Sequence, residues 1–88
     1  MSIKGLLECE ISDGLFPEEK AIMFHSAQAE RIELFAPVNL VRDGRLEVSV
    51  IESDEQKGLM LVRLPASPVT GSAIALVNRS QVKLLISA

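Results

Sequence analysis

Aromatic side chains and positive charge are both scarce in this chain. Among its 88 residues it has three Phe and no Tyr or Trp, so it offers few flat side chains on which nucleic-acid bases could stack. Its nine Lys and Arg residues are scattered and the net charge is −3, whereas binding to a phosphate backbone requires clustered positive charge. We therefore expect no nucleic-acid partner.

Nucleophiles and metal ligands are scarce as well. The chain has one histidine, His25, and one cysteine, Cys9, and its glutamates lack the spacing of calcium-binding loops. A catalytic triad needs a base held by a third group, and hydrolytic metal sites usually combine several nitrogen or sulfur ligands. We therefore expect no metal, no cofactor and no enzymatic activity. His25 is then a residue at the end of a strand, and Cys9 is a small buried side chain.

Long apolar runs are also missing. The amino-terminal residues lack the apolar stretch of a signal peptide, and no run approaches the roughly 20 residues that cross a bilayer. A single thiol cannot form a disulfide within the chain, which fits a reducing compartment. These features predict a cytoplasmic protein without a membrane partner.

The chain does contain one pattern that occurs twice. Residues 5–41 can be aligned with residues 44–82, so that Gly5 falls on Gly44 and Leu7 on Leu46. Such self-similarity is typical of an architecture built from two copies of one unit. We therefore expect a single domain over residues 1–88. Its predicted parts are one repeat at about 3–41, a second at about 44–82 and a last strand that ends at Ile86.

The hydrophobic pattern has a period of two residues, which is typical of strands with one face toward a core. Asp13-Gly14 and Asp43-Gly44 are turn dipeptides, and segments 37–40 and 79–82 are each long enough for one 3₁₀ turn. The predicted fold class is all-β: a small six- or seven-stranded barrel built from two tandem three-stranded repeats with pseudo-two-fold symmetry. The residues expected to fill its core are Leu7, Cys9, Ile11, Ile22, Phe24, Ile32, Leu34, Leu46, Val48, Val50, Leu59, Leu61, Ile74, Leu76 and Val82.

A second set of large apolar residues occupies the alternate positions of the same strands, which point to the face away from the core. Hydrophobic residues make up 48% of the chain, more than one small core can hide. An exposed apolar patch is typical of a surface that binds protein. We therefore expect a non-catalytic interaction or assembly module that binds itself as a homo-oligomer, most simply a dimer, or binds another protein. The predicted interface residues are Leu6, Met23, Phe35, Met60, Val62 and Leu64.

An alternative function comes from two arginines and from a resemblance. Arg63 interrupts the most apolar strand and Arg79 lies in the second short turn, so either could bind an anion or form a salt bridge at a barrel rim. The segment GSAIALVNRSQVKLLIS resembles the last strands of the small molybdate-binding barrels known as Mop or TOBE domains, although their amino-terminal motif has no counterpart here. The resemblance implies a small-ligand or oxyanion-binding barrel. Its candidate ligand-binding residues are Arg63, Arg79, Ser80 and Gln81.

Overall fold

The protein is described by a computed structural model that covers residues 3–69 and 71–85. Strands dominate these residues, and two 3₁₀ turns follow the fourth and eighth strands. The first strands are β1 (Ile3–Glu8), β2 (Glu10–Asp13), β3 (Glu19–His25) and β4 (Arg31–Pro37), followed by turn η1 (Val38–Leu40) and β5 (Val41–Arg42). The remaining elements are β6 (Arg45–Asp54), β7 (Leu59–Arg63), β8 (Ile74–Asn78), turn η2 (Arg79–Gln81) and β9 (Val82–Leu85).

The predicted all-β class is confirmed, and so are both predicted 3₁₀ turns. The sequence predicts a barrel but leaves open whether it is closed or half-open; the strands of residues 3–69 and 71–85 form two separate sheets, and no closed barrel is found among them. The last strand ends at Leu85 as described, and its predicted final residue, Ile86, lies outside the described residues.

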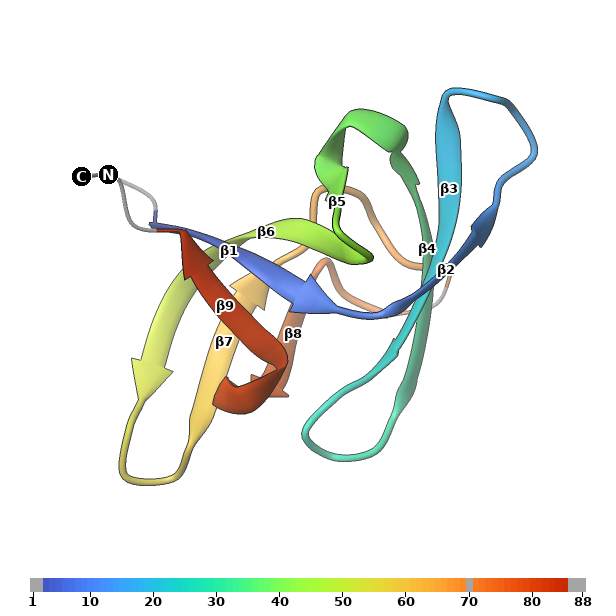
Figure 1. The fold of residues 1–88 in the computed structure, drawn as a ribbon. Helices are drawn as coiled ribbons and strands as arrows, with labels where there is room; N and C mark the ends of the chain where they lie inside the picture. Colours follow the sequence, from blue (N-terminus) through green and yellow to red (C-terminus); the bar gives the residue numbers. More distant parts are fainter. Residues whose placement is uncertain (1–2, 70, 86–88) are drawn as a thin grey trace.

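The first two strands of the chain belong to different sheets. The large sheet has the strand order β8-β7-β6-β1-β9, with β5 paired to the start of β6, and the small sheet has the order β2-β3-β4. Only Cys9 separates β1 from β2, so the chain passes directly from the large sheet into the small one. Figure 1 shows the small sheet to one side of the large sheet, with β1 leading into it. All the pairings are antiparallel.

The pairing of β1 with β6 lies at the centre of the molecule. Leu7 is the direct partner of Leu46, and both side chains are fully buried. On its other side Leu7 pairs with Val82 of β9, while Leu46 pairs with Val41 of β5. The Asp43-Gly44 turn joins β5 to β6, and positive φ angles at both residues (52° and 75°) are those of the tight hairpin turn that this dipeptide favours.

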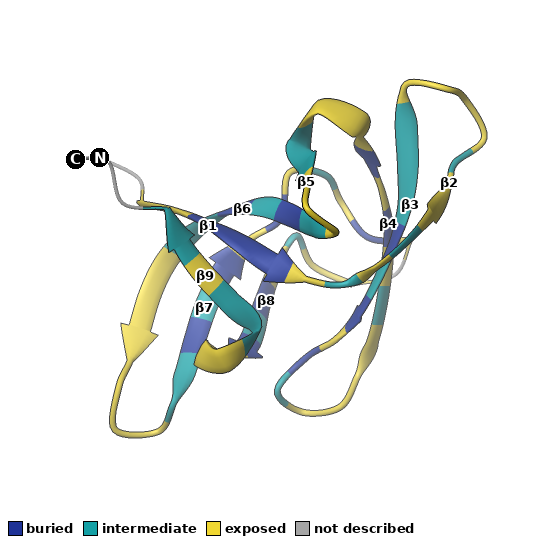
Figure 2. Cartoon of the chain, in the orientation of Figure 1, coloured by how far each residue is buried: buried dark blue, intermediate teal, exposed yellow. Residues whose placement is uncertain are grey.

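One hydrophobic core contains side chains from both sheets. Figure 2 shows buried residues, in dark blue, on strands of both sheets. The small sheet contributes Ile22, Phe24, Leu34 and Ala36, in agreement with the predicted alternation in β3 and β4. The large sheet and the loop after β7 contribute Leu7, Leu46, Val48, Met60, Val62, Leu64, Ala75 and Val77.

The predicted parity is wrong for β7 and β8. Met60 and Val62 are buried, whereas Leu59, Leu61 and Leu76, which were expected in the core, are only half-buried and Ile74 is 40% exposed. β7 is apolar on both faces, so the sequence shows no alternation there that would distinguish inside from outside. In the structure Val62 lies opposite Val50 of β6, and Met60 shares its face of β7, which packs against the core that both sheets share; a β-bulge between Val50 and Glu52 shifts the register beyond this pair.

The prediction of an interface is therefore corrected at four of its six residues. Met60, Val62 and Leu64 belong to the core, because β7 turns this face inward. Leu6 is also buried, although it faces away from Leu7. Its direct cross-strand partners are Glu47 and Lys83. Long side chains at such positions can cover a neighbouring apolar side chain with their methylene groups.

Candidate interaction surface

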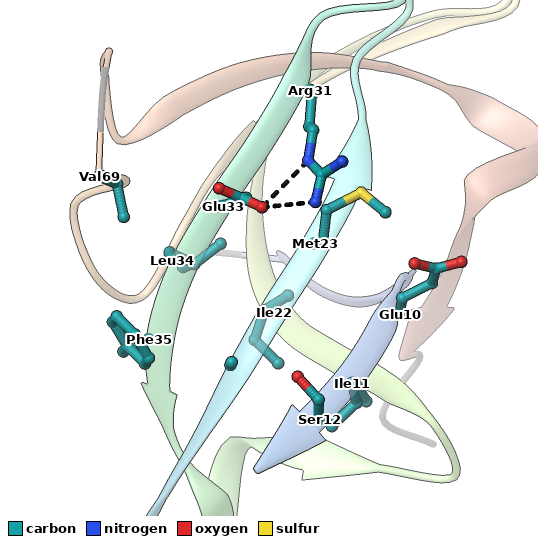
Figure 3. A pocket seen from close by; sticks show the side chains of 11 residues that line it. Glu10, Ile11, Ser12, Ile22, Met23, Arg31, Glu33, Leu34, Phe35 and Val69 are labelled. Atoms are coloured by element: carbon teal, nitrogen blue, oxygen red, sulfur yellow. Dashed lines mark hydrogen bonds and ion pairs between the residues drawn. The ribbon is translucent and has the colours of Figure 1, made fainter. Parts of the chain in front are cut away.

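The outer face of the small sheet is hollowed and partly apolar. Its cross-strand register places Ser12, Ala21 and Phe35 in one row, and Glu10, Met23 and Glu33 in the next. Because side chains alternate between the two faces of a strand, these six point away from the core residues Ile22 and Leu34. With Arg31 and with Val69 from the loop after β7, they line an open hollow of about 610 Å³ (Figure 3). The predicted interface residues Met23 and Phe35 thus lie on one surface.

Val69 reaches this surface through the backbone of its loop. Its N–H donates to the carbonyl of Glu33 at 2.8 Å, which fixes the loop against the outer edge of β4. The Val69 side chain is 67% exposed and Phe35 is 41% exposed. Sequence reasoning did not find Val69, because nothing in the pattern of a loop residue indicates which distant strand it contacts.

A second hollow lies beside the same phenylalanine. It has a volume of about 460 Å³ and is lined by Glu18, Glu19, Phe35, Ala36, Pro37, Val38 and Asn39. Phe35 is therefore accessible from two hollows, one toward Met23 and one toward the two glutamates. This arrangement leaves an aromatic side chain at the middle of the surface, a residue type that is enriched at the centres of protein interfaces.

The surface carries charges of both signs. Arg31 donates from Nη2 and Nε to Oε1 of Glu33, at 2.7 and 3.0 Å. Both side chains are at least half exposed, and an ion pair of this kind contributes about 0–1 kcal/mol. The pair therefore does little for the stability of the monomer, and Arg31 remains available to other carboxylates.

The turn between β2 and β3 exposes two more large apolar side chains, Leu15 (78%) and Phe16 (59%). Glu19 holds this turn: its Oε1 accepts from the Leu15 N–H at 3.2 Å, and its own N–H donates to the Phe16 carbonyl at 3.1 Å. A Cβ at Gly14 would approach the Glu19 carbonyl oxygen to 2.8 Å, so the close turn requires glycine. The sequence signal for this exposure is the apolar pair directly after the turn dipeptide Asp13-Gly14, which strand parity does not detect because it lies outside a strand.

The four predicted ligand-binding residues do not converge. Arg63 ends β7 beside Ile74, whereas Arg79 follows β8 at the other end of the same hairpin, where Leu59 pairs with Asn78. Four residue steps along the strand separate these ends, or about 13 Å. Arg79 instead forms an exposed ion pair with Glu55 at 3.8 Å. The spacing does not provide one pocket in which both arginines could bind a small anion.

Gln81 has a structural role in the second 3₁₀ turn. Its Oε1 accepts from the backbone N–H of Asn78 at 2.8 Å and from the Asn78 side-chain amide at 3.1 Å, and its Nε2 donates to the carbonyl of His25 at 2.9 Å. Gln81 therefore links turn η2 to the end of β3. Ser80 lies exposed in the same turn, and His25 lies exposed at the end of β3, where the sequence predicted it.

Cys9 lies half-buried at the point where the chain passes between the sheets. Burial raises the pKa of its thiol from 9.0 to about 11, and a hydrogen bond with the Leu46 backbone opposes this only partly. The thiol is therefore protonated near neutral pH, a state in which it is a poor nucleophile and a poor metal ligand. Within the described ranges, no group of three or more His, Cys, Asp or Glu residues is placed to hold a metal ion.

Cys9 should make stability fall at alkaline pH. Because the folded protein holds the thiol proton up to about pH 11 and the unfolded chain loses it near 9.0, the thiol contributes stability below pH 9 that is lost as the pH rises through 11. We expect the free energy of unfolding of the wild type, relative to Cys9→Ala, to decrease over this interval. Urea unfolding of both proteins, near neutrality and between about pH 9 and 11, measures it. A difference between them that is constant with pH would contradict the prediction.

Comparisons with protein-family models, with curated proteins and with solved structures find no match to this chain. The resemblance to the molybdate-binding barrels therefore receives no support from them. In the part of the chain that the structure describes, no helix is long and apolar enough to cross a membrane.

Proposed function

We propose that the protein is a non-catalytic interaction or assembly module that acts as a homo-oligomer, through the outer face of the small sheet. The observation that carries this proposal is the gathering of Met23, Phe35 and Val69 on one hollowed surface, where all three remain accessible. Burying one such side chain completely is worth about 1.5–3 kcal/mol, so a partner that covers the surface gains from each of them. The most economical partner is a second copy, in a closed dimer that uses the same surface on both copies.

Replacing Phe35 with glutamate should dissociate the oligomer while the fold is retained. Phe35 lies outside the hydrophobic core, so the new carboxylate stays in water in the monomer but would be desolvated in the interface. Sedimentation velocity over a range of concentrations measures the association, and circular dichroism checks the fold. A matched control is Ile51→Glu, which changes a similarly exposed apolar residue on the large sheet. A wild type that sediments as a monomer at tens of micromolar would contradict the proposed homo-oligomer.

We also propose that the two halves of the chain are related by an internal two-fold axis near the Leu7–Leu46 pair. Corresponding backbone hydrogen bonds support it. The first residue of η1, Val38, donates to Glu18 at the end of the turn before β3, and the first residue of η2, Arg79, donates to Gly58 at the end of the turn before β7, both at 2.8 Å. The strand order in each half also corresponds: three antiparallel strands in a row, a 3₁₀ turn and a short last strand.

The two sheets are joined at their edges in a corresponding way, which supports the proposal of a half-open barrel. The turn between β3 and β4 reaches the edge of β8, where Ala27 N–H donates to the carbonyl of Leu76. The loop between β7 and β8 reaches the edge of β4, where Val69 N–H donates to the carbonyl of Glu33. A turn or loop of the other half thus occupies one backbone hydrogen-bonding group of each edge, which hinders pairing of that edge with another chain.

A cytoplasmic location remains part of the proposal. It rests on the single cysteine, which cannot form a disulfide within the chain, and this is typical of proteins in a reducing compartment. Fractionation of cells that express the full natural gene product would test it, and recovery from an oxidising compartment would contradict it.

A further inference from the structure

The outer face of the small sheet is polarised along its strands. Arg31 begins β4 at one end of the face, and Pro37 ends β4 at the other end, directly opposite Glu19 of β3. Six residue steps along the strand separate the two ends, or about 20 Å. Glu18 and Glu19 both line the hollow beside Phe35, so the second end is acidic where the first end carries a guanidinium. The two rows between these ends hold Ala21, Met23 and Phe35, together with Ser12 and the carboxylates of Glu10 and Glu33.

A second copy can pack on this face about a two-fold axis in only two general ways. If the axis runs along the strands, each end of the face meets the same end of the second copy, so that arginine faces arginine and glutamates face glutamates. If the axis runs across the strands, each end meets the opposite end. Like charges brought together at an interface are costly, whereas opposite charges stabilise the arrangement and determine its orientation. The polarity of the face therefore favours the axis across the strands.

The sizes of the central side chains agree with this choice. About an axis across the strands, β3 of one copy lies over β3 of the other in reversed direction. The axis then passes near Ile22 and Leu34, midway between Arg31 and Pro37. It brings Met23 of each copy over Ala21 of the other, and Phe35 over Glu33, whose carboxylate can turn toward the Arg31 beside it. A long flexible side chain over a small one can fill the space between two facing sheets without a void.

We infer that the partner of this surface is a second copy of the chain, packed face to face with its strands reversed, so that Arg31 of each copy faces Glu18 and Glu19 of the other. This inference rests on the proposed function, because it names the partner and the geometry for the same surface. Within one copy Arg31 already contacts Glu33, but both side chains are at least half exposed. Facing a second carboxylate therefore requires no buried pair to be broken.

Two charge-reversal variants test this geometry when they are mixed. In Arg31→Glu, both ends of the face are acidic, and in Glu18→Arg the acidic end gains a positive charge. Glu18 is suitable because the fold uses its backbone carbonyl, which accepts from Val38 at 2.8 Å, and this carbonyl is unchanged by the substitution. Each variant alone should have a dissociation constant about tenfold or more above that of the wild type, because like charges then meet at both ends of the interface.

An equimolar mixture of the two variants should restore association. In the mixed dimer, the glutamate introduced by Arg31→Glu in one chain faces the arginine introduced by Glu18→Arg in the other. At the opposite end, the unchanged Arg31 faces the unchanged Glu18. The mixture should therefore form a one-to-one heterodimer with a dissociation constant near that of the wild type.

Sedimentation velocity measures the affinity of the mixture, and native mass spectrometry identifies the heterodimer by its mass. The matched controls are Arg63→Glu and Glu52→Arg, which make the same charge changes on the large sheet. Both controls should leave association unchanged.

The possible failures are distinguishable. A monomeric wild type would overturn both the proposed homo-oligomer and this geometry. A wild-type dimer that Phe35→Glu dissociates, combined with a mixture that remains monomeric, would overturn the reversed-strand arrangement and leave the proposed function standing. Dissociation by Arg63→Glu or Glu52→Arg, with no effect of Arg31→Glu, would overturn the choice of this face.

Discussion

Replacing Val62 with glutamate is expected to unfold the protein. Val62 is fully buried in β7 and packs in the core that both sheets share. A carboxylate there would have no partner, and an uncompensated buried charge costs about 3–5 kcal/mol, which approaches the whole stability of many small domains. Far-UV circular dichroism and urea unfolding measure the loss.

The matched control for this substitution is Leu61→Glu. Leu61 is the preceding residue of the same strand, faces the opposite side and is only half-buried. Its glutamate variant should keep a cooperative unfolding transition. If Leu61→Glu unfolds the chain and Val62→Glu does not, β7 has the parity predicted from the sequence and not the one in the structure.

Truncating Leu46 to alanine should destabilise the fold by about 2–5 kcal/mol, the range found for buried leucines. Leu46 is fully buried, lies at the centre of the large sheet, and pairs with both Leu7 and Val41. Chemical unfolding at one fixed protein concentration measures the change, because self-association would otherwise alter the apparent stability. The control Leu15→Ala removes a side chain that is 78% exposed and should change stability by less than about 0.5 kcal/mol.

The same leucine pair provides a further check on the centre of the fold. Since Leu7 and Leu46 are direct cross-strand partners, their alanine substitutions should not be additive. The double variant Leu7→Ala/Leu46→Ala should lose less than the sum of the two single losses, because the first truncation already removes their mutual contact. Strictly additive losses would mean that the two side chains do not pack against each other.

Local signals in the sequence predicted several elements correctly. Asp43-Gly44 forms the tight turn into β6, and the two predicted 3₁₀ turns occur at 38–40 and 79–81. Polar and apolar residues alternate from Arg31 to Leu34, and continuing that parity along β4 predicted both the core residue Leu34 and the accessible Phe35. These features depend on backbone geometry and on the two faces of one strand, which are encoded within a few neighbouring residues.

The glycines of the two proposed repeats show where sequence alignment alone is insufficient. Gly5 and Gly44 are equivalent in the sequence alignment, but Gly44 lies in a turn with open space around it and a φ of 75°. Gly5 lies within β1, where a Cβ would approach the Val82 Cγ1 to 2.6 Å. The first glycine is required by its tertiary neighbour and the second by its local backbone, and only the latter requirement can be recognised from adjacent residues.

By itself, the sequence determined the all-β class, the positions of the turns and the inward residues of β3 and β4. It also indicated an excess of apolar side chains for one small core, although not which of them remain accessible. The tertiary structure decided that question in β7, where both faces are apolar and packing between the two sheets buries Met60 and Val62. It also placed Val69 beside Met23 and Phe35 on the outer face of the small sheet, through a backbone hydrogen bond to β4. Alternation is a property of one strand, whereas register and the packing of loops depend on contacts between residues far apart in the chain.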